Sequence, residues 1–286
     1  MSRLTAVTIF NRSIVLLKED DKKPRIFKQQ KAKSFLIIKK PEVVSFLRNI
    51  KVPIKRWLSD AVLFISPYMC ELCGDRLMKG EHVLCARCFD SLPRTSWSKD
   101  LYSNAMAQHF WRKINIEAAF AFVHHKGHSH ASDLIYQLKY CHNEGVGLWM
   151  GRMIGRELKD TELAEKADII IPVPLAKKRV RQRGYNQSDL IAEGLAQTIG
   201  LPMRTDIIMR TSFKRSQTAM TNEQREQNVK DAFVLLKPED IKGKHIILVD
   251  DVVTTGATVC SIGKELEKAG DVKISIVSWG AAFGTF

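Results

Sequence analysis

Two adjacent acids, Asp250 and Asp251, lie between an apolar run at residues 246–249 and a loop of small residues at 254–258. The apolar run predicts a buried strand, so both carboxylates fall at its carboxyl end, where open α/β sheets bind ligands. The loop exposes backbone N–H groups and hydroxyls and leads into a predicted helix, whose positive end suits a phosphate dianion. Its residues are Thr254, Thr255, Gly256, Ala257 and Thr258.

Carboxylates beside a phosphate cradle repel the anion unless they face hydroxyl groups or a metal ion. A ribose 5-phosphate fits both halves of the stretch, with its phosphate in the loop and its 2- and 3-hydroxyls on the two acids. The alternative is a strand–turn–helix whose acids only cap the helix. The stretch predicts a ribose-phosphate site, and a strand–turn–helix without a ligand is the competing interpretation.

A second polar segment follows another predicted buried strand, which ends at residues 172–174. Five basic residues occupy seven consecutive positions there: Lys177, Lys178, Arg179, Arg181 and Arg183. A helix then begins, with Asn186 or Ser188 as its candidate N-cap. Basic side chains beside a helix start suit a pyrophosphate group, and we assign Lys178, Arg179 and Arg183 to it. The alternative is a solvated basic turn.

Four of the six cysteines form two CxxC pairs, with residues 74–84 between them. Two such pairs can hold one Zn²⁺ in a structural site, because four thiolates leave no open position on the metal. A redox CxxC needs only one pair, and disulfides are not expected in a chain without an export signal. The expected ligands are Cys70, Cys73, Cys85 and Cys88, with His82 as a weak alternative.

Strands that alternate with helices are predicted to position these groups. Apolar and β-branched runs predict strands at 118–124, 168–173, 244–249 and 272–278, and helical spacing predicts helices at 132–139, 146–159, 186–199 and 258–269. Runs that are apolar on both faces are typical of a parallel sheet covered by helices, so the fold class is α/β. The histidines 124, 125, 128 and 130 have no acids at helical or strand spacing beside them, which argues against a metal site there.

The 286 residues are 45% hydrophobic, which is enough for a buried core and suggests one or two domains. The net charge of +14 is concentrated at the start, where residues 1–56 hold 15 Lys and Arg but 4 Asp and Glu. This basic arm indicates an anionic partner such as nucleic acid, or else only a solvated tail. No apolar run is long enough to span a bilayer and no signal peptide is recognised, so a cytoplasmic protein is expected.

The cysteine pairs followed by the sugar-phosphate stretch resemble the ComF family, the relatives of competence protein F. The resemblance covers about residues 65–286 and is carried by CELCG, LCARC, YQLKY, PVPLAKKRVRQRGYNQS, RSQTAMTNEQREQNVKDAF and ILVDDVVTTGAT. It implies a type I phosphoribosyltransferase fold, a parallel sheet flanked by helices, with a small N-terminal zinc ribbon. The implied domains are a basic extension at 1–60, the zinc ribbon at 61–95, and the transferase domain at 96–286. The last includes the hood, the part of this fold that selects the acceptor.

The resemblance also implies phosphoribosyl pyrophosphate (PRPP) as ligand, with Mg²⁺ bound mainly to its phosphates. Asp250 and Asp251 would hold the ribose, and a mobile loop within 210–233 would bring Lys214 or Arg215 over the substrate. One interpretation is an enzyme that transfers the pentosyl group to an unidentified nitrogen acceptor. The other is a PRPP-binding module that contacts single-stranded DNA or competence proteins during DNA uptake.

Overall fold

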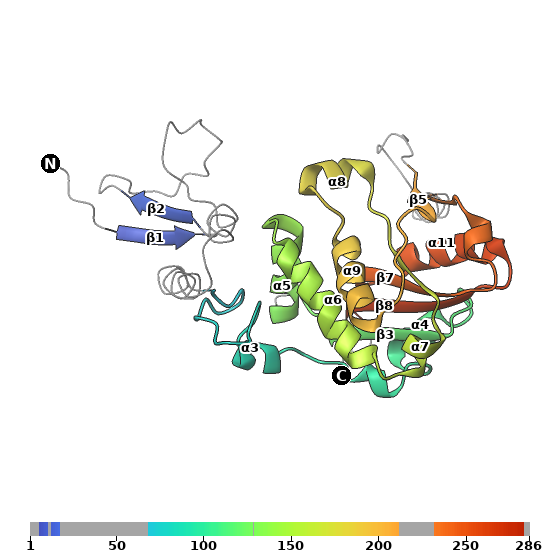
Figure 1. Ribbon diagram of the computed structural model, residues 1–286, viewed down its shortest axis with the longest axis horizontal. Coiled ribbons are helices and arrows are strands. Elements are labelled where there is room, and N and C mark those ends of the chain that lie inside the picture. The colour runs from blue at the N-terminus through green and yellow to red at the C-terminus, as the bar shows by residue number, and fades with distance from the viewer. Residues whose placement is uncertain (1–5, 11–12, 18–67, 128, 212–231, 283–286) are drawn as a thin grey trace, which may run out of the picture. The chain divides into compact units, whose positions relative to one another are not determined.

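The computed structural model describes residues 6–10, 13–17, 68–127, 129–211 and 232–282 (Figure 1). The chain divides into two compact units, Met1–Tyr68 and Met69–Phe286. In the first unit, β1 (Ala6–Phe10) and β2 (Ser13–Leu17) pair antiparallel, with Ala6 opposite Leu17. All other described elements belong to the second unit, which carries the predicted sugar-phosphate residues.

A four-stranded sheet with the order β3-β8-β7-β4 forms the centre of the second unit. Its strands are β3 (Ala118–His124), β4 (Ile169–Pro172), β7 (His245–Val253) and β8 (Lys273–Ala281). Every pairing within it is parallel. The predicted parallel sheet is confirmed, and because its strands share one direction, all their carboxyl ends meet at one edge.

Helices cover both faces of this sheet. On one face, α5 (His130–Tyr140), α6 (Glu144–Leu158) and α9 (Gln187–Ile199) share a core with Ile247 and Val249. On the other, α4 (Ala105–Phe110), α11 (Ala257–Leu266) and the hairpin of β5 (Ile208–Arg210) and β6 (Phe233–Leu235) pack on Ile246 and Leu248. Apolar side chains that point alternately to the two faces of β7 thus contribute to both cores, as expected for a strand buried on two faces.

Helices α6 and α9 approach so closely that only glycine fits between them. A Cβ atom on Gly151 would lie 2.0 Å from the carbonyl oxygen of Ile191, and one on Gly194 would lie 2.2 Å from that of Leu148. This backbone contact fixes α9 against the sheet. The start of α9, at Gln187, is thereby held at the carboxyl edge beside β7.

The cysteine segment shares the core of the sheet. Helix α3 (Ala86–Asp90) places the Phe89 ring 6.4 Å from Phe122 of β3 and 6.0 Å from Trp149 of α6. Farther along, Arg94 lies over the Phe122 ring at 4.1 Å and forms an ion pair with Glu157. Residues 69–95 therefore belong to the same packed body as the sheet.

The predicted strands and helices of the sheet region are all present, with ends shifted by a few residues. The basic segment after β4 differs, because it forms a helix, α8 (Lys177–Arg183), closed by Gly184 with φ of 82°. Four shorter pieces complete the unit: α7 (Glu162–Lys166), η1 (Trp97–Lys99), η2 (Pro238–Asp240) and η3 (Glu267–Ala269).

Candidate functional site

Asp250 and Asp251 lie near the carboxyl end of β7, and both are half-buried. Both carboxylates contact helices of the same face of the sheet, Asp250 with α9 and Asp251 with α5. The Asp251 N–H donates to Asp250 Oδ1 at 2.8 Å, and the Val252 N–H donates to Asp251 Oδ1 at 2.6 Å. These local bonds fix both carboxylates, each of which keeps acceptor capacity for a ligand hydroxyl.

The environment of Asp250 favours its protonated form. Burial, then the neighbouring charge of Asp251, raises the pKa of Asp250 to about 7. The hydroxyl of Ser188, in the first turn of α9, donates to Asp250 Oδ1 at 3.3 Å. At neutral pH a carboxyl group with this pKa can donate a hydrogen bond when protonated and accept one when ionised. This suits two neighbouring hydroxyl groups such as those of a ribose.

Asp251 is bound by Lys139, a lysine of the YQLKY motif to which the sequence assigned no role. Lys139 Nζ of α5 lies 2.7 Å from Asp251 Oδ2, and the two side chains are 23% and 14% exposed. The sequence places Lys139 only in a helix, 112 positions before Asp251. Their proximity depends on α5 lying over the end of β7.

The small-residue loop ends at Gly256, which is the N-cap of α11 with φ of 72°. That left-handed conformation favours glycine, and a Cβ atom here would also lie 2.6 Å from the Phe110 ring. His109 Nε2 is 2.9 Å from the carbonyl oxygen of Thr255, so α4 holds the loop from outside. Thr254, Thr255 and Ala257 remain exposed, and Thr258 is half-buried. The loop therefore leads into a helix start, the geometry that the anion-cradle prediction requires.

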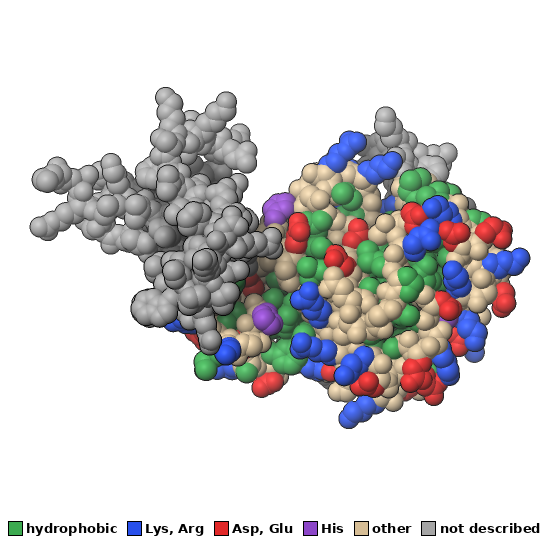
Figure 2. Space-filling model, in the orientation of Figure 1, with side chains coloured by type: hydrophobic (Ala, Val, Ile, Leu, Met, Phe, Trp, Pro, Cys, Tyr) green, Lys and Arg blue, Asp and Glu red, His purple; other side chains and the backbone are tan. Residues whose placement is uncertain are grey.

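The basic residues of α8 are placed unequally. Lys178 and Arg179 are exposed, and Lys and Arg side chains project over α8 in Figure 2. Arg183 is half-buried, donates to Gln187 Oε1 at 2.7 Å, and lies 5.5 Å from the Tyr140 ring centre. The helix therefore brings Arg183 to Gln187 at the start of α9, one residue before Ser188.

The predicted N-cap of α9 is Asn186, but its amide does not cap the helix. Asn186 Nδ2 donates to the Val173 carbonyl at 2.9 Å and to Asp189 Oδ1 at 2.6 Å. The first N–H groups of α9 thus receive no side-chain cap. This buried amide ties the end of β4 to the start of α9.

Arg210, at the end of β5, is a further cation at this edge. Burial, then the charge of Arg179, lowers the pKa of Arg210, and Asp250 acts in the opposite direction. Its guanidinium also lies 5.3 Å from the Phe233 ring centre. In the sequence, Arg210 stood only at the start of the predicted mobile loop. The predicted closing residues Lys214 and Arg215 lie outside the described residues.

Five buried side-chain nitrogen and oxygen atoms have no hydrogen-bond partner among the described residues. Two of them are Gln187 Nε2, in the first turn of α9, and His125 Nδ1, directly after β3. Unsatisfied buried polar atoms are costly, so ligand groups would stabilise them. A polar ligand at the carboxyl edge is consistent with both.

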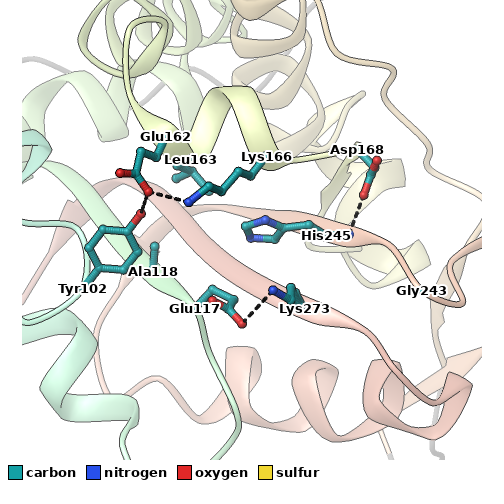
Figure 3. Close-up of a pocket in the computed structure, with 10 residues that line it drawn as sticks. All are labelled: Tyr102, Glu117, Ala118, Glu162, Leu163, Lys166, Asp168, Gly243, His245 and Lys273. Atoms are coloured by element: carbon teal, nitrogen blue, oxygen red, sulfur yellow. Dashed lines mark hydrogen bonds and ion pairs between the residues drawn. The ribbon is translucent and has the colours of Figure 1, made fainter.

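A pocket of about 360 Å³ lies at the opposite edge of the sheet (Figure 3). Ala118, His245 and Lys273, the first residues of three strands, line it together with charged side chains of neighbouring elements. Its two lysines are paired: Lys166 with Glu162 at 2.6 Å and Lys273 with Glu117 at 3.7 Å. The pocket is therefore separate from the acid pair and offers no free cation for a phosphate.

The four cysteines of the CxxC pairs form a compact cluster in which all sulfur atoms lie within 4.8 Å of one another. The Cys73 and Cys85 sulfur atoms are 3.7 Å apart, close to the edge of about 3.8 Å that four sulfurs at roughly 2.3 Å from one zinc ion make. Burial and the neighbouring thiols raise the pKa of Cys88, so a cation is needed for all four to ionise. The cluster fits a metal ion such as zinc.

Residues 187–279 match the phosphoribosyl transferase domain family. This match includes α9, β7 and α11, and hence both acids and the small-residue loop. The chain is also 29% identical to competence protein F of Haemophilus influenzae over 223 residues, which cover 75% of this chain and 96% of that protein. The chain is a homologue of competence protein F. The resemblance seen in the sequence is confirmed.

The chain is also 28% identical to DNA utilization protein YhgH of Escherichia coli K12, over 79% of this chain and 96% of that protein. Among solved structures, the purine phosphoribosyltransferase of Pyrococcus horikoshii is 20% identical with a TM-score of 0.32, over 48% of this chain and 84% of that chain. The parallel sheet and the family match establish a phosphoribosyltransferase fold with a four-cysteine cluster before it. None of the described helices has the length and apolar character that a membrane crossing requires.

Proposed function

We propose that the carboxyl edge of the sheet binds PRPP. Asp250 and Asp251 accept the ribose hydroxyls, and the loop 254–258 with the start of α11 holds the 5-phosphate. Lys178, Arg179 and Arg183 of α8 neutralise the pyrophosphate. The proposal is carried by one observation: the strand end with the paired acids runs directly into a small-residue loop and a helix start, and the basic helix α8 precedes α9 at the same edge.

The chemistry proposed for this site is transfer of the phosphoribosyl group to a nitrogen acceptor. Mg²⁺ would be carried mainly by the pyrophosphate oxygens, as is usual for phosphate-bound magnesium. The acids would stabilise positive charge growing on the sugar, and the oriented N–H groups and arginines would stabilise the departing pyrophosphate. Lys214 and Arg215 would close over the substrate and exclude water.

Calorimetric titration of Mg²⁺-PRPP into the wild type, Asp250→Asn and Asp251→Asn tests the binding proposal. Micromolar binding by the wild type and loss of at least tenfold in each variant are expected. Asp160→Asn is a matched control, because Asp160 has an 85% exposed side chain, stands just before α7, which lines the pocket at the opposite edge of the sheet, and pairs only loosely with Lys159. Absence of binding to the wild type would refute the site.

A second function is favoured by the relatives' names, which refer to competence and DNA utilization. In that case the chain supports DNA uptake as a PRPP-binding module that contacts single-stranded DNA or a competence partner. Pyrophosphate release across a panel of nitrogen acceptors separates the two: release supports the enzyme, and binding without release supports the module. DNA binding through the arm at residues 1–56 should weaken steeply with salt and disappear when the arm is deleted.

We also propose that the four-cysteine cluster holds a structural Zn²⁺ and that the protein acts in the cytoplasm. Four thiolates complete a tetrahedral site and leave no position for a substrate. The domain division proposed is an extension at 1–60, the zinc ribbon at 61–95 and the transferase domain at 96–286. Metal analysis of the purified protein should give one zinc per chain, and a cobalt-substituted sample should show the intense visible bands of thiolate coordination.

A further inference from the structure

Three side chains that are far apart in the sequence lie near the end of β7: His125 after β3, Lys139 of α5 and Asp251 of β7. Lys139 and Asp251 form an ion pair at 2.7 Å. Burial lowers the pKa of His125, the charge of Lys139 lowers it further, and Asp251 acts in the opposite direction. The imidazole therefore lies within electrostatic reach of the ion pair.

The backbone fixes His125 at this position. Its N–H donates to the Ala281 carbonyl at 2.7 Å, at the end of β8. A Cβ atom on Gly280 would lie 3.2 Å from the His125 Cβ, so the missing side chain there makes room for the histidine. Gly280 pairs with Val252 of β7. Gly280 of β8, which has no side chain, thus lies between His125 and the strand that carries the acids.

The imidazole is a base without a partner. Its Nδ1 atom is buried and forms no hydrogen bond with any described residue. Because the pKa of His125 is lowered from 6.5, the ring is neutral at neutral pH, and with the proton on Nε2 the Nδ1 atom can accept another. Asp250, the other candidate base, already accepts from Ser188 and from the backbone of Asp251.

We propose that His125 accepts the proton that the nitrogen acceptor loses during phosphoribosyl transfer, and that Lys139 positions Asp251 beside it. This step depends on the PRPP site proposed above. The acceptor nitrogen forms a bond to the anomeric carbon, the bond from that carbon to pyrophosphate breaks, and pyrophosphate leaves with the electron pair. The proton moves from the acceptor nitrogen to His125 Nδ1. The acceptor is therefore a compound with an N–H group, such as ammonia, an amine or a heterocyclic N–H.

Two variants of neighbouring histidines form a matched test. His125→Gln keeps a polar side chain but removes the base. His124→Gln is the control, because the His124 ring lies against Trp97 at 5.3 Å and its Nδ1 atom is equally unpartnered among the described residues. Calorimetry with Mg²⁺-PRPP comes first, and both variants should bind within about threefold of the wild type. If the wild type did not bind Mg²⁺-PRPP, the PRPP site itself would be refuted, and not only the role of His125.

Pyrophosphate release is then measured with ammonia, primary amines and nucleobases as acceptors. His125→Gln should lower kcat by about 10²–10⁴-fold, the usual contribution of general base catalysis, with little change in KM for PRPP. His124→Gln should retain wild-type kcat. Equal rates for His125→Gln and the wild type would overturn the proposal. Binding of PRPP without release from any acceptor would also overturn it, while the binding site would stand.

Nitrogen-15 resonances of the histidines give a readout that a merely structural role would not change. Titration with Mg²⁺-PRPP should shift the His125 ring signals and leave those of His124 unchanged. In Lys139→Met the pKa of His125 should rise, because the nearby positive charge is gone, and the acid limb of the rate profile should move to higher pH. The charged groups that act on His125 are Lys139 and Asp251. Unchanged His125 signals at saturating PRPP would place the ring outside the site and refute the role.

Discussion

Lys139 Nζ lies 2.7 Å from Asp251 Oδ2, so a helix on one face of the sheet holds the second acid of the sugar-phosphate stretch. This contact orients the carboxylate before any ligand arrives. We expect Lys139→Met to weaken PRPP binding by about tenfold, or about 1.4 kcal/mol, because a charge-assisted hydrogen bond is lost.

Lys139→Arg is the matched control for that loss, since it keeps the positive charge and should retain most of the affinity. Calorimetry with Mg²⁺-PRPP measures both variants. If Lys139→Met bound as tightly as the wild type, Lys139 would have no part in orienting Asp251.

Asp250 predicts a pH dependence of stability in the absence of ligand. Its pKa is raised to about 7 in the folded chain from 3.8, so between about pH 4 and 7 the folded state holds more protons than the unfolded state. This contribution to stability is therefore present at low pH and lost as pH rises through that window, with a slope of at most about 1.4 kcal/mol per pH unit.

Urea unfolding of the wild type and Asp250→Asn between pH 5 and 8 measures that contribution. The variant should lack it, so its stability relative to the wild type should increase with pH. A constant difference between the two proteins across this range would show that Asp250 titrates near its ordinary pKa.

Metal removal should destabilise the whole described unit from Met69 onward. Phe89, inside the second CxxC pair's helix, packs on Phe122 and Trp149 of the sheet layer, so loss of the metal would disturb that core. Chelator treatment or Cys73→Ser should lower the melting temperature by roughly 10 °C or more.

Cys141→Ser is the matched control, because Cys141 lies outside the four-sulfur cluster. Calorimetric melting of the full chain is the measurement. An unfolding transition of the sheet that kept its midpoint after complete zinc loss would show that the cysteine segment does not support the core.

We expect a substitution of Gly151 to disrupt the packing of α6 against α9. Gly151→Ala would push a Cβ atom against the Ile191 carbonyl, which the structure places 2.0 Å away. Backbone cannot yield as a flexible side chain does, so α6 and α9 must separate, at a cost of about 1–3 kcal/mol or more. Because α9 carries Ser188 to Asp250, PRPP affinity should fall with stability.

Gly145→Ala in the same helix is the control, since its new Cβ would meet only Asn143 Oδ1, at 3.5 Å. Alanine is a better helix former than glycine, so this variant should be neutral or slightly stabilising. Urea midpoints of the two variants should therefore differ clearly, and equal midpoints would contradict the close helix contact.

Much of the fold could be predicted from the sequence because each pattern lies within a short stretch of chain. The β-branched run at 169–171 and the apolar run before Asp250 predicted parallel strands, and β4 and β7 are parallel neighbours. The acid pair, the loop 254–258 and the CxxC spacing were found for the same reason, because each lies within one short stretch of chain. Helix α8 was missed: its seven residues are nearly all basic, so it has no apolar face to give a helical period.

The sequence by itself therefore determined the α/β class, the acid pair with its small-residue loop, and the cysteine pairs. Only the tertiary structure decided which side chains from distant elements lie near the acid pair, among them Lys139, Arg210 and His125. Their signals are single polar residues without periodicity, and nothing local distinguishes them from surface residues. They lie near the acids because parallel strands end at one edge and because α5 and the β5–β6 hairpin pack on the two faces of the sheet beside that edge.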